Sequence, residues 1–550
     1  MVFEKRRRHL ARFIEMGRVL ARHQWEHLLA QLGLSELFHL RPHGKGILPD
    51  PTDVRESLEE LGPTFIKLGQ LLSTRPDIIP AQYVAELEKL QDTAPTVPIN
   101  KIFKVIEEEF GMAPDSIFEH FDETPLAAAS LGQTHLATLK NGTKVVVKIQ
   151  RPDIHRVIET DLEILQGLAH FVEQHSERMR TLGISDLVEE FAITIRQELD
   201  YTHEGRNTDR IRENLKELKF VRVPMVYWEY TTPRVLTIEQ ITGIKITDIH
   251  ELDEHGLDRK NVAKNLAKAF MEMIFIHGFF HGDPHPGNLV VLDDCAIGLL
   301  DFGIAGRLDH RLKTAVTILL AEYIQENSAG FAEEILRIGS YPQDLNRRAF
   351  ELEIDRALRQ FYGAPLKEIR MGELLRKAFQ ISAKNHVRLP SNMFLLVKVL
   401  VNIDGIARQL YPDFDFAGEA RPYVRRAMRE EFSINTLANQ AYKSLVLFKN
   451  FLLSLPDMAQ YLLGRMVEGS FRINFKHEGL EGLMRSLERA ANRLSFALVA
   501  SATIVASALI VAAKIGPLWH GYPIIALIGF GISVIFGFWL MIAILRAGKL

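Results

Sequence analysis

The sequence predicts an α+β fold of two lobes, with a helical extension before it and a pair of apolar helices after it. Three observations support this prediction. Residues 124–152 alternate apolar runs with turn residues, which is typical of antiparallel strands. Residues 280–303 place polar side chains between two further apolar runs. Near the end of the chain, two stretches of about twenty residues carry no charge, a length that crosses about 30 Å of hydrocarbon.

The 550 residues are expected to divide into several segments, because a chain of this length is too long for one hydrophobic core. The expected segments are a helical extension (1–115), an N-lobe with a helical insert (116–240), a C-lobe (241–430), an amphipathic connector (431–493) and two transmembrane helices (494–513 and 522–545).

Within the extension, residues 62–73 predict a short amphipathic helix. Pro63 suits the first turn of a helix. Lys67 and Gln70 are three residues apart and share one face. Three apolar residues form a stripe on a different face, namely Phe65, Leu68 and Leu72. From these residues alone, the segment is an amphipathic helix with an exposed lysine.

The N-lobe is expected to contain a sheet with a hairpin turn at Asn141 and Gly142. The strand after this turn has apolar residues at alternate positions, namely Val145, Val147 and Ile149. Lys148 therefore points to the opposite face. A lysine inside a valine-rich strand is costly unless it meets a phosphate or a carboxylate. The alternative is a lysine on an edge strand that reaches solvent.

The helical run 185–214 offers carboxylates for this lysine. In one continuous helix Asp200 and Glu204 share a face, while Glu198 projects elsewhere. We therefore expect Glu204 to form an ion pair with Lys148. Taken singly, each of these acids could instead be a solvated charge on a helix.

Asp283, Asn288 and Asp301 follow one another at intervals of five and thirteen residues, and Phe-Gly comes directly after Asp301. This is the layout of a phosphotransferase catalytic loop, in which the first Asp orients or accepts the hydroxyl proton and the Asn and second Asp hold metal ions. Such oxygen ligands suit Mg²⁺. The alternative is a turn rich in His and Pro between two buried strands. We expect ATP or ADP with Mg²⁺ here, with the adenine meeting backbone groups near Glu239.

On these residues the chain resembles the UbiB/AarF family of atypical protein-kinase-like proteins, which is linked to ubiquinone biosynthesis. The resemblance covers nearly the whole chain. Besides the catalytic loop, it rests on a Lys-x-Gly-Gln motif (Lys67, Gly69, Gln70), an alanine-rich loop (Ala127, Ala128, Ala129, Ser130, Gly132) and a Glu-x-Asp motif (Glu198, Asp200).

The resemblance implies an atypical protein-kinase-like fold in which the helix of Lys67 folds over the active-site cleft. Lys67 would be directed toward Glu198 and Asp200, and large substrates would be excluded. The alanine-rich loop would hold phosphates differently from a glycine loop, because alanine disfavours the φ values that glycine allows. It would favour ADP and suppress autophosphorylation. Gly282 stands where protein kinases commonly have Arg, so control by activation-loop phosphorylation is not expected.

The implied function is a membrane-anchored atypical kinase or ATPase that supports the biosynthesis of ubiquinone or a related isoprenoid lipid. Its partners would be an isoprenoid lipid or quinone precursor, the membrane and other quinone-biosynthesis proteins. The alternative is a nucleotide-responsive lipid-binding or scaffold protein with little phosphotransfer. A true protein kinase is a third reading, which the occluding extension disfavours.

Composition excludes several other classes of protein. A net charge of −3 argues against a nucleic-acid-binding protein, although the first twenty-two residues are basic and amphipathic. The single cysteine, Cys295, excludes an intramolecular disulfide and any CxxC metal site. His281 and His285 flank Asp283 and are expected to support the loop rather than bind zinc. The N-terminal residues lack the apolar core of a signal peptide.

The two uncharged stretches are expected to form a hairpin that crosses the bacterial inner membrane. The alternative is a hydrophobic hairpin in a soluble protein. Positive residues flank both ends of the pair, namely Arg485, Arg489, Arg493, Arg546 and Lys549. Because positive residues stay on the cytoplasmic side, both ends and the kinase-like domain should be cytoplasmic. The connector before the first helix could lie on the bilayer surface.

Overall fold

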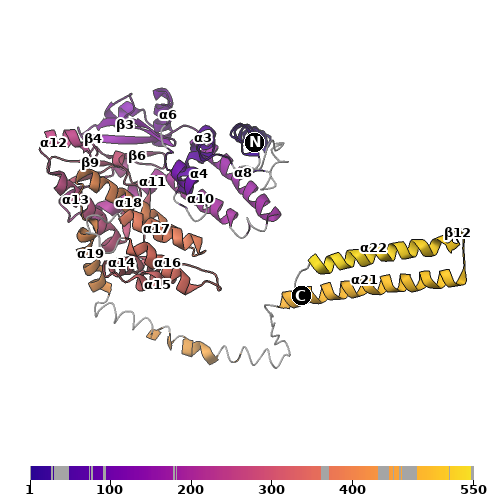
Figure 1. The fold of residues 1–550 in the computed structure, drawn as a ribbon. Helices are drawn as coiled ribbons and strands as arrows, with labels where there is room; N and C mark the ends of the chain where they lie inside the picture. Colours follow the sequence, from indigo (N-terminus) through magenta and orange to yellow (C-terminus); the bar gives the residue numbers. More distant parts are fainter. Residues whose placement is uncertain are drawn as a thin grey trace. The chain divides into compact units, whose positions relative to one another are not determined.

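Figure 1 shows the fold of the chain in a computed structural model. The structure describes residues 2–26, 29, 49–73, 75, 79–90, 94–176, 180, 183–360, 371–431, 445–446, 448–449, 451–456, 460, 480–519 and 521–546. The chain forms two compact units, Met1–Gln440 and Ala441–Leu550.

The N-lobe contains a five-stranded antiparallel sheet. Its strands are β1 (Phe118–Phe121), β3 (Gly132–Leu139), β4 (Lys144–Gln150) and β6 (Val235–Glu239) in spatial order, with β2 (Ala127–Ala128) also paired to β3. The predicted turn joins β3 to β4, where Gly142 has a φ of 81°, a value that glycine adopts without strain. The apolar residues of β4 are fully buried, as predicted, and Lys148 lies on the other face.

Each face of this sheet has a different covering. The helix α6 (Ile99–Phe110) covers the apolar face, where Ile102 and Ile106 pack against β4 (Figure 1). The helix α11 (Tyr201–Leu215) packs against β6 and brings Glu204 to Lys148. The polar face of the sheet is therefore the face that forms the site.

The extension is a layer of helices beside the N-lobe (Figure 1). It consists of α1 (Val2–Arg22), α3 (Pro51–Leu61), α4 (Pro63–Ser73) and α5 (Ala81–Leu87), which pack with α8 (Ile154–His175) and α10 (Ile184–Glu198). The predicted helix at 62–73 is α4, and Phe65 is buried in it, whereas Leu68 and Leu72 are only partly buried. A Cβ atom at Gly69 would lie 2.8 Å from Leu58 Cδ1 and closer still to Leu90 Cδ1, so glycine permits the close approach of α4 to its neighbours.

A buried ion pair fixes α4 to the rest of the extension. Arg12 Nε donates to Asp161 Oδ1 at 2.8 Å, and Thr64 Oγ1 donates to Asp161 Oδ2 at 2.7 Å. Arg12 also donates to the carbonyl of Leu61 at 2.6 Å. Asp161 is fully buried, so these donors provide the hydrogen bonds that its carboxylate would lose on leaving water. Three helices, α1, α4 and α8, meet at this one carboxylate.

The C-lobe is mainly helical. Its helices are α12 (Ile249–Glu254), α13 (Arg259–Met271), α14 (His310–Ile324), α15 (Ser328–Ile338), α16 (Arg347–Arg359), α17 (Met371–Lys384), α18 (Ser391–Leu410) and α19 (Phe416–Glu431). Four short strands form one sheet in the order β5 (Val221–Arg222), β10 (Ile297–Leu299), β9 (Leu289–Val291) and β7 (Ile244–Lys245). A second pair is β8 (Phe279–His281) with β11 (Ala305–Arg307). A core formed by α13, α14 and α18 holds these strands in place.

The prediction of one continuous helix over residues 185–214 is wrong. The helix α10 ends at Glu198, and Asp200 is the N-cap of α11. The Asp200 carboxylate accepts the backbone N–H of Thr202 at 3.0 Å, which satisfies a donor that the new helix leaves free. Glu198 and Glu204 therefore lie on two different helices and can serve two different sites.

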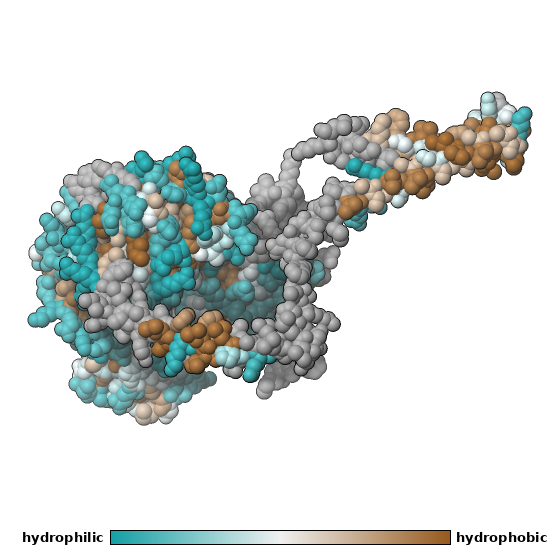
Figure 2. Space-filling model, turned by 90° about the horizontal axis from the view of Figure 1, so that it is seen from below, coloured by the Kyte–Doolittle hydropathy of each residue, from teal (hydrophilic) through white to brown (hydrophobic). Residues whose placement is uncertain are grey.

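The second unit contains two apolar helices, α21 (Leu480–Ala513) and α22 (Ile524–Arg546), joined by a turn with the short strands β12 (Leu518–Trp519) and β13 (Tyr522–Pro523). The helices pack against each other, with Phe496 against Trp539 at 5.6 Å between ring centroids. A Cβ atom at Gly529 would overlap Ser507 Oγ, so glycine allows close packing. Figure 2 shows hydrophobic residues exposed along both helices.

Among the described residues, one helix is long and apolar enough to cross a membrane, Ala490–Ala513. This stretch contains the first span expected at 494–513. The span expected at 522–545 falls on α22, in which the apolar stretch Ile524–Trp539 is shorter. The connector expected at 431–493 lies largely outside the described residues, and α21 already begins within it at Leu480.

Replacing Asp161 by Asn should lower the free energy of unfolding by about 3 kcal/mol, because the largely buried Arg12 loses its buried counter-charge and keeps only the exposed Glu15. The control is Glu163→Gln on the same helix, where the carboxylate is 41% exposed and pairs with Lys5. That change should lower the free energy by less than about 1 kcal/mol. Denaturant unfolding of the full-length variants measures both. Equal losses in the two variants would contradict the anchoring role of Asp161.

Candidate active site

Lys148 lies at the centre of a cluster of charges between the lobes. Its Nζ atom is 2.8 Å and 3.0 Å from the two carboxylate oxygens of Glu204, and 3.2 Å from Asp301 Oδ2. The ammonium also lies 5.2 Å from the ring centroid of Tyr201. The predicted ion pair of Lys148 with Glu204 is therefore present, and Asp301 joins it from the C-lobe.

The pKa values in this cluster follow from burial and from the neighbouring charges. Burial alone would lower the pKa of Lys148, but Asp301 and Glu204 outweigh it and hold that pKa well above its usual range. Burial raises the pKa of Glu204, and the Lys148 ammonium opposes this rise. Burial would likewise raise the pKa of Asp301, but Lys148 and the Gly303 N–H hold it well below its usual range. Lys148 stays a cation and Asp301 an anion at neutral pH.

Asp283 is held at the end of β8 by its neighbours in the loop. The backbone N–H of Gly282 donates to the carbonyl of Ile304 at 2.8 Å, and the Asn288 amide donates to the carbonyl of Asp283 at 3.2 Å. A Cβ atom at position 282 would lie 2.7 Å from Ile304 Cγ2, which explains why glycine precedes Asp283. The loop therefore packs directly on the segment that follows Asp301.

Asn288 and Asp301 come from adjacent strand ends. Asn288 precedes β9, Asp301 follows β10, and the N–H of Leu300 donates to the Asn288 carbonyl at 3.1 Å. The Asp301 side chain is 42% exposed, and its Oδ1 atom accepts the N–H of Gly303 at 2.9 Å. A partly exposed carboxylate of low pKa and a carboxamide from the adjacent strand end are oxygen donors of the kind that Mg²⁺ prefers. The residues present therefore fit the expected metal.

The alanine-rich loop is tied to the extension. Ala127 and Ala128 form β2, and the carbonyl of Ala128 accepts the N–H of Ala94 at 3.1 Å. The Arg151 guanidinium donates to the carbonyls of Ala129 and Pro95 at 2.9 Å and 2.6 Å. The loop thus has hydrogen bonds within the sheet and to Ala94, and Arg151 links it to the carbonyl of Pro95.

The end of this loop approaches the lysine cluster closely. A Cβ atom at Gly132 would overlap Tyr201 Oη and the Ile149 carbonyl, so only glycine fits there. Ser130 is buried beside it. The ring of Tyr201 also faces Lys148. One tyrosine therefore contacts the loop on one side and the lysine on the other.

Lys67 of the extension points at the end of α10. Its Nζ atom is 3.0 Å from Glu198 Oε2, and both side chains are 13% exposed. Asp200 is the cap of α11, and Gln70 Nε2 lies 3.5 Å from the Leu90 carbonyl within the extension. The expected approach of Lys67 to the Glu-x-Asp motif is therefore present at Glu198.

Arg75, just after α4, extends this contact to both lobes. It pairs with Glu190 of α10 at 3.3 Å, and its guanidinium lies 6.0 Å from the ring centroid of Phe394 on α18. The extension therefore contacts the N-lobe insert and a helix of the C-lobe.

Glu239 ends β6 at the junction of the lobes. Its side chain pairs with Arg222 and accepts the backbone N–H of Met225 at 3.1 Å. Its own N–H donates to the Met225 carbonyl at 2.8 Å. The side chain is thus engaged with the 222–225 segment, apart from the cluster around Lys148.

Lys398 on α18 also belongs to the site, although it was not predicted from the sequence. Its Nζ atom lies 3.0 Å from Asp283 Oδ1, although the two residues are 115 positions apart. A signal was available, because Lys398 interrupts an apolar run in which Val397 and Val399 are buried. The rule that selected Lys148, a lysine among apolar neighbours, would have selected Lys398 too.

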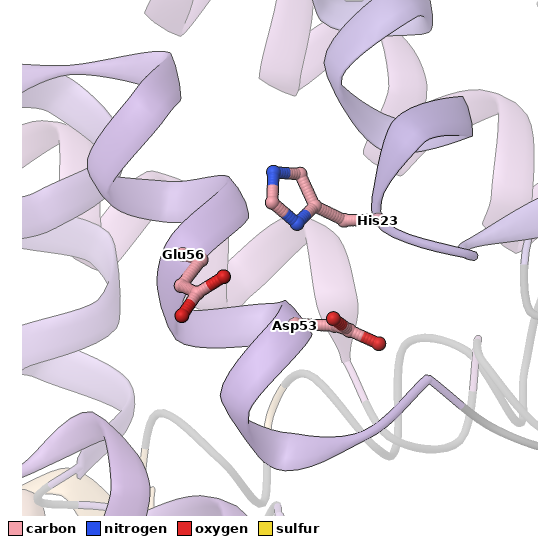
Figure 3. A group of neighbouring side chains, drawn as sticks. All are labelled: His23, Asp53 and Glu56. Atoms are coloured by element: carbon pink, nitrogen blue, oxygen red, sulfur yellow. The ribbon is translucent and has the colours of Figure 1, made fainter.

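A second group of possible metal ligands lies in the extension. The ligand atoms of His23, Asp53 and Glu56 lie within 4.8 Å of one another (Figure 3). His23 Nε2 already pairs with Glu60 at 3.0 Å, and Asp53 accepts a hydrogen bond from Gln24. These contacts explain why His23, Asp53 and Glu56 lie together: they are part of the polar surface between α1 and α3.

The fold and the charges around Lys148 and Asp283 define a kinase-like protein. Residues 89–335 match the ABC1 atypical kinase-like domain, residues 354–415 the UbiB helical domain, and residues 478–546 the ABC1/UbiB kinase-like C-terminal domain. The chain belongs to the ABC1/UbiB atypical kinase-like family. A domain of this kind implies nucleotide binding.

Individual relatives align over most of the chain. A Clostridium pasteurianum protein named for the 5′ region of hydrogenase 1 is 34% identical over 91% of this chain and 94% of its own. The "probable protein kinase UbiB" of Azotobacter vinelandii is 34% identical over 76% of this chain and 78% of its own. A solved structure from Mycobacterium tuberculosis, titled as a complex with erythromycin, aligns with a TM-score of 0.47 at 25% identity over 66% of this chain and 93% of its own.

Acid should destabilise the protein through His281. This ring is buried beside Phe302, and burial lowers its pKa from 6.5 to about 4. In the unfolded chain the ring gains a proton below about pH 6.5, while the folded ring stays neutral until about pH 4. Stability is therefore fully present above pH 6.5 and is lost as the pH falls toward 4.

Between pH 7 and pH 5 this loss should be about 2 kcal/mol in the free energy of unfolding. His281→Asn cannot titrate and should lose that much less over the same interval, by denaturant unfolding of the full-length protein. His250→Asn, at an exposed histidine, should keep the wild-type pH dependence. A pH dependence unchanged by His281→Asn would show that His281 does not carry this effect.

Proposed function

We propose that this protein is a membrane-anchored atypical kinase or ATPase that binds a magnesium nucleotide and supports the biosynthesis of ubiquinone or a related isoprenoid lipid. The observation that carries the proposal is the meeting of Lys148, Glu204 and Asp301 beside Asp283 and Asn288. A phosphate-binding lysine with its glutamate, two candidate metal ligands and a candidate base are then present together. The family membership and the relatives named UbiB support the link to this pathway.

Each residue has a distinct role in this proposal. Lys148 would bind the nucleotide phosphates, held in place by Glu204. Asn288 and Asp301 would hold Mg²⁺, which neutralises phosphate charge when bound. Asp283 would orient the acceptor hydroxyl or water and accept its proton. The alanine-rich loop (Ala127, Ala128, Ala129, Ser130 and Gly132) would cover the phosphates, and backbone groups near Glu239 would meet the adenine.

The extension supports a small or lipid-like acceptor rather than a protein. Lys67 with Glu198, and Arg75 with Glu190 and Phe394, connect the extension to both lobes. A helix held in this way would obstruct a folded polypeptide at the cleft. We therefore assign Lys67, Gly69, Gln70, Glu198 and Asp200 to a gate over the site.

The test of this function measures nucleotide binding and phosphate release on full-length protein, with and without isoprenoid phenols and anionic liposomes. Asp301→Asn should abolish Mg²⁺-dependent binding and release, because a formal charge is lost at the cation. Asp293→Asn, an exposed residue in the β9–β10 turn, is the matched control and should retain both. Undiminished Mg²⁺-dependent affinity in Asp301→Asn would refute the kinase-like assignment of this loop.

The contacts of the extension also favour a second candidate, a nucleotide-responsive lipid-binding or scaffold protein with little phosphotransfer. The two candidates differ in turnover. If the wild type binds nucleotide but releases phosphate no faster than Asp283→Asn under every condition, the second function holds instead.

For the membrane, we propose that α21 and α22 form a hairpin that crosses the bilayer, with both ends and the kinase-like domain on the cytoplasmic side. The apolar stretch Ala490–Ala513 and the packing of α21 on α22 support this arrangement. A chain ending before Leu480 should be soluble and still bind nucleotide, because the site residues all precede it. Full-length protein should pellet with membranes and resist alkaline extraction. Extraction of the full-length protein by alkali would contradict a spanning hairpin.

A further inference from the structure

The carboxylate of Asp283 pairs with a cation that lies far along the chain. Lys398 Nζ is 3.0 Å from Asp283 Oδ1, with the two side chains 38% and 29% exposed. The loop at 281–288 reads HGDPHPGN and contains no lysine or arginine of its own. The negative charge of Asp283 is instead balanced by Lys398 of α18. This helix lies in the segment that matches the UbiB helical domain rather than the kinase-like domain.

His285 is the other group beside this carboxylate. Its Nε2 atom is 3.7 Å from Asp283 Oδ2, beyond a good hydrogen bond. Its Nδ1 atom accepts the N–H of Gly287 at 3.0 Å, which assigns the remaining ring position to the proton when the ring is neutral. Lys398 makes the closer of the two contacts, at 3.0 Å from the Asp283 carboxylate against 3.7 Å for His285.

The backbone of α18 is fixed relative to the loop. The helix packs against β11, and Asn392 at its start donates to the Arg307 carbonyl of that strand at 2.9 Å. The strand β11 in turn pairs with β8, which leads into Asp283. Val397 and Val399 on either side of Lys398 are buried. Lys398 is therefore positioned next to the Asp283 carboxylate by a well-packed helix rather than by a loop.

The charges of the site give this lysine a function. Glu204, Asp283 and Asp301 are three carboxylates, and Lys148 is already 2.8 Å from Glu204 and 3.2 Å from Asp301. A nucleotide brings further negative charge toward Asp283, which would repel this carboxylate and turn it away. A lysine that holds one carboxylate oxygen leaves the other for a hydroxyl.

We propose that Lys398 is a positioning residue for the reaction, which holds the Asp283 carboxylate in the orientation that accepts the hydroxyl proton. This inference rests on the proposed phosphotransfer function. It extends the functional unit from the kinase-like domain to α18. Phe394, one turn earlier on the same helix, contacts Arg75 of the extension, so α18 carries both the positioning lysine and a contact with the extension.

The experiment compares Lys398→Met, Lys398→Arg and Lys384→Met in the full-length protein. Lys384→Met is the matched control, because it removes the same charge from α17, where Lys384 pairs with Glu353 at 2.8 Å. The readouts are the affinity for ADP with Mg²⁺, and kcat and KM for phosphate release from ATP. Lys398→Met should lower kcat about tenfold to a hundredfold, as loss of orientation does, and leave ADP affinity within about twofold.

Lys398→Arg should recover a large part of kcat, since guanidinium can also hold the carboxylate. Lys384→Met should match the wild type. A kcat in Lys398→Met equal to or above that of the wild type would overturn the inference, and so would a loss that Arg does not recover while ADP affinity is retained. If the wild type releases no phosphate beyond Asp283→Asn, the proposed function fails, and the inference fails with it. Turnover in the wild type that persists in Lys398→Met refutes the inference alone.

Discussion

The structure depends on the ion cluster that joins Lys148, Glu204 and Asp301. These groups come from a strand of the N-lobe, a helix behind it and the start of the segment after β10, and the buried Glu204 and the largely buried Lys148 would be costly without a partner. The cluster therefore stabilises the arrangement in which these three segments meet. The buried valines of β4 set the face on which Lys148 emerges, and the cap at Asp200 sets where Glu204 falls on its helix. Packing of β4 and the helix cap at Asp200 thus determine where the charged side chains lie. The ion pairs form because these two local features place the charges within contact distance.

The same principle operates a second time in the extension. In the interior, Asp161 accepts hydrogen bonds from Arg12 and Thr64. About one turn further along α4, Lys67 pairs with Glu198. The first contact is buried and fixes the helix, whereas the second lies at the edge of the site. Anchoring and contact with the site therefore lie on one short helix, and Gly69, two residues after Lys67, lets that helix approach its neighbours closely.

The parts of the site that could be predicted were those whose signal is local. Alternation in β4 identified the face of Lys148, the Asn-Gly turn located the hairpin, and the pattern around Asp283, Asn288 and Asp301 predicted a polar loop flanked by buried strands. The break at Asp200 was missed because helical periodicity continues across it, although an aspartate at a helix start is a capping signal. Lys398 was missed because its partner lies 115 residues away, a distance at which only tertiary packing determines proximity. The contact of the Glu239 side chain with Arg222 likewise depends on tertiary packing, because the two residues lie on different strands.

The alanine-rich loop is linked to residue 94 by a direct hydrogen bond and to residue 95 through Arg151, and these links have a thermodynamic consequence. The N–H of Ala94 donates to the carbonyl of Ala128, and Arg151 bridges Pro95 to Ala129, so the alanine-rich loop and the chain that leads out of the extension share one set of hydrogen bonds. A ligand that shifts the extension must break or strain them, and a nucleotide that rearranges the loop must do so as well. Because the two equilibria share these bonds, linkage is reciprocal. If a lipid that binds the extension changes the nucleotide affinity by some factor, the nucleotide must change the affinity for that lipid by the same factor.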